Sequence, residues 1–123
     1  MSLLESGENY LEAIYRLSKE TNELHAIDIV NDLGFSKPSV SIALKKLRDD
    51  EYIYIDKSSH IFLTEKGLDI AIKIYERHTI LTSLLIKLGV SSDTAEEDAC
   101  KIEHYLSNET FDAIKKYYNN MNK

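Results

Sequence analysis

The periodicity of apolar residues changes in the middle of this chain, and the change limits the folds that the chain can adopt. Residues 8–50 carry apolar side chains at helical spacing. Residues 51–56, "EYIYID", and residues 60–64, "HIFLT", are instead rich in aromatic and branched side chains, as strands are. The intervening "KSS" indicates a tight turn, so the two runs predict a hairpin. From residue 65 onward the helical spacing returns, which predicts a mainly α protein with one hairpin between two sets of helices.

The helical segments are bounded by recognisable start and stop signals. Gly34 stands where a C-terminal glycine ends a helix, and Gly89 ends the long helix in the same way. Ser36 is a typical N-cap, and Pro38 fits the first turn that follows it. The predicted helices span residues 8–19, 25–34, 36–50, 65–88, 91–107 and 109–120.

Two short helices joined by "GFS" and followed by a hairpin match a winged helix-turn-helix, whose second helix enters the DNA major groove. The whole chain has a net charge of −6, yet residues 36–48 contain four cations and no acid. That local charge favours binding to phosphates of double-stranded DNA. The alternative is a winged helix that binds proteins. The predicted DNA-binding residues are Ser36, Lys37, Pro38, Ser39, Ser41, Ile42, Lys45 and Lys46.

The single cysteine of the chain lies in the stretch "DACKIEH", with Glu103 three residues and His104 four residues after Cys100. On a helix these positions share one face. Thiolate, carboxylate and imidazole together suit a divalent transition metal. Further ligands have to come from elsewhere, and His78 is the best candidate, with Glu8, Asn9 and Glu12 also available. The alternatives are an ordinary helix face and a catalytic Cys–His pair, although the chain lacks a glycine-rich loop or nucleophile elbow.

Composition narrows the setting in which the chain works. It contains no run of about 18 apolar residues, which a membrane-spanning helix needs. The start, "MSLLESGENYLEA", lacks the basic and apolar regions of a signal peptide. One cysteine forms no internal disulfide, which fits a reducing cytoplasm. We therefore expect a cytoplasmic protein without a membrane partner.

Four stretches together resemble the metal-dependent repressors that include the diphtheria toxin repressor and the manganese transport regulator. They are "ENYLEAIYRL", "SKPSVSIALKKLRDDEYI", "LTEKG" and "DACKIEH", and the last is the most specific. The resemblance implies a homodimeric, metal-dependent DNA-binding repressor of metal-ion homeostasis. It also implies a winged helix-turn-helix domain at residues 1–72 and a helical metal-binding and dimerisation domain at 73–123, with the metal as corepressor at their junction. The runner-up is a winged-helix regulator that senses a non-metal ligand.

The same resemblance implies a ligand set of mixed type. Cys100 matches the iron-type members, whereas Glu12 matches the manganese type, so Fe(II) or Mn(II) is the expected metal. Asn9 stands where the family usually has methionine or aspartate. Thr82 and Glu96 replace an acid and a histidine that a second iron-type site would use. The implied metal ligands are Asn9, Glu12, His78, Cys100, Glu103 and His104.

Overall fold

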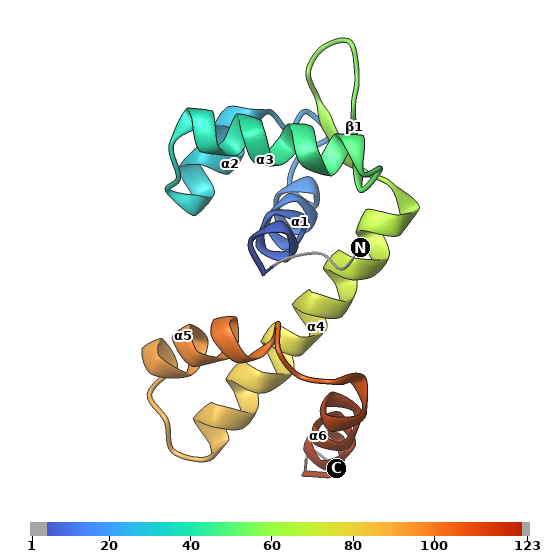
Figure 1. Cartoon of the computed structure of the whole chain (residues 1–123). Coiled ribbons are helices and arrows are strands. Elements are labelled where there is room, and N and C mark those ends of the chain that lie inside the picture. Colours follow the sequence, from blue (N-terminus) through green and yellow to red (C-terminus); the bar gives the residue numbers. More distant parts are fainter. Residues whose placement is uncertain (1–4, 122–123) are drawn as a thin grey trace. The chain divides into compact units, whose positions relative to one another are not determined.

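The computed structural model describes residues 5–121, and it confirms the expected mainly helical fold with one hairpin (Figure 1). Among these residues the order is three helices, two antiparallel strands and three more helices. Every helix in the described part is too short or too polar to cross a membrane. The elements are α1 (Glu5–Ser18), α2 (Ala26–Leu33), α3 (Lys37–Asp49), β1 (Ile53–Ile55), β2 (Ile61–Leu63), α4 (Glu65–Lys87), α5 (Ser92–Ile102) and α6 (Asn108–Met121).

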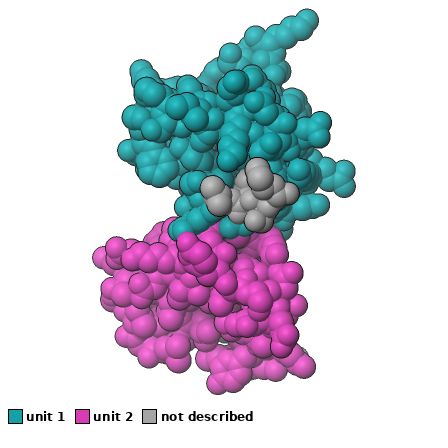
Figure 2. All heavy atoms as spheres, viewed as in Figure 1, with its two compact units in different colours: residues 1–72 teal, residues 73–123 magenta. Residues whose placement is uncertain are grey.

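The chain divides into two compact units, with the boundary between Ile72 and Lys73 (Figure 2). The first unit contains α1, α2, α3, the hairpin and the start of α4. The second contains the rest of α4 together with α5 and α6. The boundary lies within α4, so one continuous helix contributes residues to both units.

The core of the first unit forms around α1, which contacts α2, α3 and β2. Leu11 and Ile14 on α1 are fully buried, because apolar positions at helical spacing face the other helices. On α3 the inner stripe is buried at Val40, Leu44 and Leu47, whereas Ala43 is only partly buried. With one side of α3 in the core, its other side faces solvent.

The hairpin is shorter than the sequence predicted, because only three residues on each strand pair. Ile53 faces Leu63 and Ile55 faces Ile61. The Asp56 carboxylate then organises the turn by accepting hydrogen bonds from the backbone N–H groups of His60 and Ser58. These hydrogen bonds lower the pKa of Asp56 below its ordinary value, the one from His60 most strongly.

The stretch "LTEKG" fixes the start of α4 against the end of α3. Thr64 Oγ1 accepts a hydrogen bond from the N–H of Gly67 at 3.1 Å and donates one to the carbonyl oxygen of Glu51 at 2.7 Å. Lys66 Nζ donates to the carbonyl oxygen of Asp50 at 3.1 Å. Gly67 packs so closely on Tyr52 that a Cβ atom there would overlap the Tyr52 carbonyl oxygen.

We therefore expect Gly67→Ala to destabilise the chain by about 1–3 kcal/mol, because the backbone has to move to accept the methyl group. Thermal unfolding followed by circular dichroism measures this change. Asp69→Ala, at an exposed position of the same helix, is the control and is expected to shift the midpoint little. Equal midpoints for the two variants would contradict the tight approach of Gly67 to Tyr52.

Helix α5 ends at Ile102, five residues before the predicted end at 107, and residues 103–105 form a turn. Two contacts explain the early end. The Arg77 guanidinium donates hydrogen bonds to the carbonyl oxygens of Glu103 and Leu106, which therefore need no helical partner. Ser107 Oγ accepts a hydrogen bond from the N–H of Thr110, which begins α6. The prediction of one helix through 107 was wrong, so His104 lies in a turn.

Candidate functional site

The second unit brings together three of the predicted metal ligands. His78 on α4, Cys100 on α5 and Glu103 at the C-terminal end of α5 place one ligand atom each within 4.8 Å of one another. His78 Nδ1 lies 2.9 Å from Glu103 Oε2. Glu103 is fully buried, His78 is partly buried and Cys100 is exposed. The site is therefore anchored in the core and open at the thiol.

His104 is next to this cluster and faces the same carboxylate. Its Nε2 lies 3.5 Å from Glu103 Oε1, and its side chain is 1% exposed. Glu103 thus has His78 near one carboxylate oxygen and His104 near the other. His104 does not belong to the group of three whose ligand atoms lie within 4.8 Å of one another.

The donor atoms fit a divalent transition metal. Metal–ligand bonds of about 2.0–2.3 Å place neighbouring ligand atoms roughly 3.3–3.8 Å apart, so the three side chains reach a common ion after a small contraction. A sulfur, a nitrogen and a carboxylate oxygen form a mixed donor set that binds zinc, iron, cobalt or manganese. The buried carboxylate also supplies the negative charge that an ion needs there.

A buried arginine that the sequence analysis did not identify holds the end of α5. Arg77 Nη1 donates to the carbonyl oxygens of Glu103 at 3.0 Å and Leu106 at 2.7 Å, and Nη2 donates to Asn108 Oδ1 at 3.0 Å. Its guanidinium lies 5.2 Å from the centre of the Phe111 ring. The available signal was a cation on the apolar face of α4, directly before His78. Arg77 therefore fixes the backbone that carries Glu103.

The remaining predicted ligands, Asn9 and Glu12, lie on α1 in the first unit, and their participation stays a prediction. Both are partly buried. Glu12 Oε1 accepts a hydrogen bond from Arg16 Nε at 3.0 Å, and Arg16 Nη2 donates to Asp32 Oδ2 on α2 at 2.7 Å. The hydrogen bond to Asp32 is the main cause of a raised pKa at Arg16 and outweighs the opposing effect of burial. Arg16 therefore joins α1 to α2 as a permanent cation.

The predicted DNA-binding residues form the solvent-facing side of α3. Ser36 caps the helix by accepting a hydrogen bond from the N–H of Ser39 at 3.3 Å. Within residues 5–121, no carboxylate lies within ion-pair distance of Lys37, Lys45 or Lys46. Ile42 is 72% exposed, an unusual position for a large apolar side chain. All eight predicted positions are exposed, namely Ser36, Lys37, Pro38, Ser39, Ser41, Ile42, Lys45 and Lys46.

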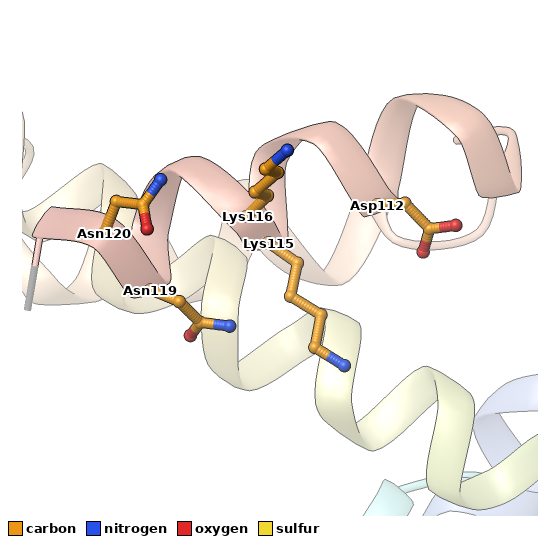
Figure 3. Close-up of a pocket in the computed structure, with 5 residues that line it drawn as sticks. All are labelled: Asp112, Lys115, Lys116, Asn119 and Asn120. Carbon is orange, nitrogen blue, oxygen red and sulfur yellow. The ribbon is translucent and has the colours of Figure 1, made fainter.

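A shallow hollow along α6 has a different character from the metal-ligand cluster (Figure 3). Its lining comes from one helix, and Lys115 extends from it to contact Glu76 on α4 at 3.0 Å. It presents two amides, two amines and a single carboxylate, without the imidazole and thiol of the metal-ligand cluster. The lining residues are Asp112, Lys115, Lys116, Asn119 and Asn120.

Curated relatives resemble this chain over most of its length. The transcriptional regulator MntR of Escherichia coli O6:H1 is 37% identical over 108 residues, which are 88% of this chain and 70% of that protein. An uncharacterized HTH-type transcriptional regulator of Methanocaldococcus jannaschii is 36% identical over 113 residues, which are 90% of each chain.

Solved structures of metal-dependent regulators also resemble the fold of this chain. The manganese regulator SloR matches with a TM-score of 0.83 at 29% identity, covering 97% of this chain and 55% of that one. The metal-dependent transcriptional regulator MtsR also has a TM-score of 0.83, at 25% identity, covering 92% of this chain and 53% of that one. This chain thus spans about half the length of these solved structures.

Two family matches together cover nearly all of the sequence. Residues 2–61 match the family described as "Iron dependent repressor, N-terminal DNA binding domain". Residues 64–123 match "Iron dependent repressor, metal binding and dimerisation domain". The resemblance of the four sequence stretches is thereby confirmed, and the chain belongs to the iron-dependent repressor family.

Proposed function

We propose that this chain is a metal-activated transcriptional repressor whose corepressor is Fe(II) or Mn(II). The observation that carries the proposal is the convergence of His78, Cys100 and Glu103 on one point in the second unit. The names of the relatives support it, because MntR is a transcriptional regulator and SloR a manganese regulator. In this proposal the chain acts by binding, with no catalytic role for Cys100.

The metal ligands in this proposal come from both units. His78, Cys100, Glu103 and His104 supply the donors of the second unit, and Asn9 and Glu12 on α1 complete the set. A divalent ion would supply a positive centre for these donors. Glu103 would neutralise part of its charge, His78 and Cys100 would supply a nitrogen and a sulfur ligand, and Arg77 keeps the Glu103 backbone in place.

The proposed DNA-binding surface, which metal would regulate, is the solvent-facing side of α3. Its N-terminal N–H groups, with the hydroxyls of Ser36 and Ser39, suit phosphate oxygens at the start of a helix. Lys37 and Lys45 add positive charge, and Ile42 offers an apolar contact for a thymine methyl group. Metal favours the DNA-binding state to the extent that it binds that state more tightly.

Dimerisation through the second unit is the third element of the proposal. Several large apolar side chains there are exposed and are available to an interface between two copies of the chain. A symmetric dimer would cover part of this surface and present two α3 helices to successive major grooves. The exposed residues are Ile86, Leu88, Ile102, Tyr105, Tyr117 and Met121.

The first prediction concerns the metal requirement. We expect a duplex selected from random-sequence DNA in the presence of Mn(II) to bind the chain only when a divalent metal is added. An anaerobic titration with Fe(II), Mn(II), Co(II) and Zn(II), followed by mobility shift, measures the requirement and ranks the ions. Chelator is expected to abolish binding, and equal affinity with and without metal would show that the metal is not the corepressor.

The second prediction concerns the DNA surface. We expect Lys37→Ala and Lys45→Ala each to weaken binding at every sequence and to reduce the slope of log affinity against log salt by about 1, because each removes one phosphate contact. Lys116→Ala, an exposed lysine of the second unit, is the matched control. If both α3 variants keep the native slope, the DNA-binding surface lies elsewhere.

A further inference from the structure

Two histidines distant in sequence meet at the base of the hairpin. The N–H of Ile61 on β2 donates to the carbonyl oxygen of Leu24 at 2.8 Å, so the segment before α2 lies beside β2. This contact brings His25 next to His60, with ring centres 4.8 Å apart and ring planes at 69°. Both side chains are partly buried and remain accessible to water. The pair lies wholly within the first unit, whereas Cys100 belongs to the second.

Each histidine has an aspartate partner, which contacts the imidazole of His60 but the backbone of His25. Asp56 Oδ1 accepts a hydrogen bond from the backbone N–H of His60 at 2.8 Å. The other carboxylate oxygen, Oδ2, lies 3.1 Å from Nδ1 of the His60 ring. A carboxylate at Nδ1 selects the tautomer that keeps its proton there, and the Nε2 lone pair is then available to a ligand. Histidines that bind metals are commonly oriented in this way. The backbone N–H of His25 donates to Asp28 Oδ2 at 2.9 Å, which fixes the start of α2.

The separation of the two rings suits a shared metal ion. An ion bonded to one nitrogen of each imidazole at about 2.0–2.1 Å holds the two ring centres roughly 5 Å apart. The observed separation of 4.8 Å has this size. Imidazole nitrogens favour Zn(II), Ni(II) and Cu(II), and water completes the coordination of an ion held by two protein ligands.

We propose that His25 and His60 form a second metal site, specific for an imidazole-preferring divalent ion such as Zn(II), with Asp56 as the residue that orients His60. An ion there joins β2 to the residue that precedes α2. It therefore fastens the hairpin to the helix-turn-helix within the DNA-binding unit. This inference does not depend on the corepressor role of the cluster around Cys100.

Nuclear magnetic resonance of the histidine side chains tests the proposal in the full chain, because the sequence contains only four histidines. We expect Zn(II) to shift the imidazole signals of His25 and His60 together, in a single step of the titration. His60→Gln is expected to abolish the shift of His25, and His25→Gln that of His60. Signals of His25 and His60 that stay in place at tenfold excess of Zn(II) would reduce the pair to an edge-to-face ring contact and overturn the proposal.

A second measurement separates this site from the one around Cys100. Co(II) bound by a thiolate gives a charge-transfer absorption that imidazole and carboxylate ligands do not give. We expect His60→Gln to retain this absorption and His78→Gln to lose it. In His78→Gln, Zn(II) is still expected to raise the unfolding temperature, and adding His60→Gln is expected to remove that rise. Loss of the thiolate absorption in His60→Gln would show that the two sites are not independent. Persistence of the His25 shift in that variant would show that His25 and His60 do not share a metal.

Discussion

Glu103→Gln is expected to lower the affinity of the chain for Mn(II) or Co(II) by at least about 100-fold, because loss of a residue that only orients a ligand already costs 10–100-fold. The substitution removes the negative charge from the centre of the cluster while keeping nearly the same shape. Without added metal, the unfolding temperature of the variant is expected to stay close to that of the native chain. The reason is that a buried carboxylate costs desolvation that an amide avoids. The stabilisation that metal gives the native chain is expected to be lost.

Glu97→Gln is the matched control for this experiment. It makes the same chemical change at an exposed position of α5. Metal affinity from chelator competition and unfolding temperatures with and without Mn(II) are the two measurements. An equal loss of affinity in both variants would point to a general charge effect, and native affinity in Glu103→Gln would remove Glu103 from the metal site.

Arg77→Met is expected to destabilise the chain by about 2–5 kcal/mol, because buried or partly buried acceptor oxygens lose their donor and each costs about 1–3 kcal/mol. Methionine fills most of the same space but donates no hydrogen bond. The carbonyl oxygens of Glu103 and Leu106 then lose their donor, as does the side-chain oxygen of Asn108. Chemical denaturation measures the loss.

Lys115→Met provides the comparison, because Lys115 makes a single ion pair with Glu76 and is 40% exposed. An exposed pair of this kind contributes about 1 kcal/mol or less. The connection between α5 and α6 has to be re-examined if Arg77→Met unfolds at the same denaturant concentration as Lys115→Met.

The fold was largely predictable because the elements are marked by local signals. Gly34 and Ser36 bound α2 and α3 closely, since a left-handed glycine and a serine cap are determined by neighbouring residues alone. The end of α5 was not predictable in this way. The arginine that satisfies the Glu103 carbonyl lies 26 residues earlier in the chain, and no local pattern indicates such a contact.

In the candidate metal site, too, features set by neighbouring residues were predictable and features set by distant contacts were not. Helical spacing and donor chemistry were enough to select Cys100 and Glu103, and His78 followed as the best additional donor. The position of His104 depends on the turn after Ile102, which the helical spacing did not predict. Neither Arg16 nor Arg77 was predicted, because the role of each depends on partners in other helices.

The pairing of Arg16 with Glu12 has a consequence for how the chain would respond to metal. In the absence of metal, the positive charge of Arg16 neutralises the Glu12 carboxylate. If Glu12 is a metal ligand, as we propose, binding of the metal there would replace one cation with another. Metal would then bind at Glu12 only where it outcompetes the guanidinium, so the strength of this ion pair would help to set the metal concentration at which the chain responds. Loss of the contact with Glu12 would leave Arg16 paired with Asp32 alone, on the first helix of the helix-turn-helix.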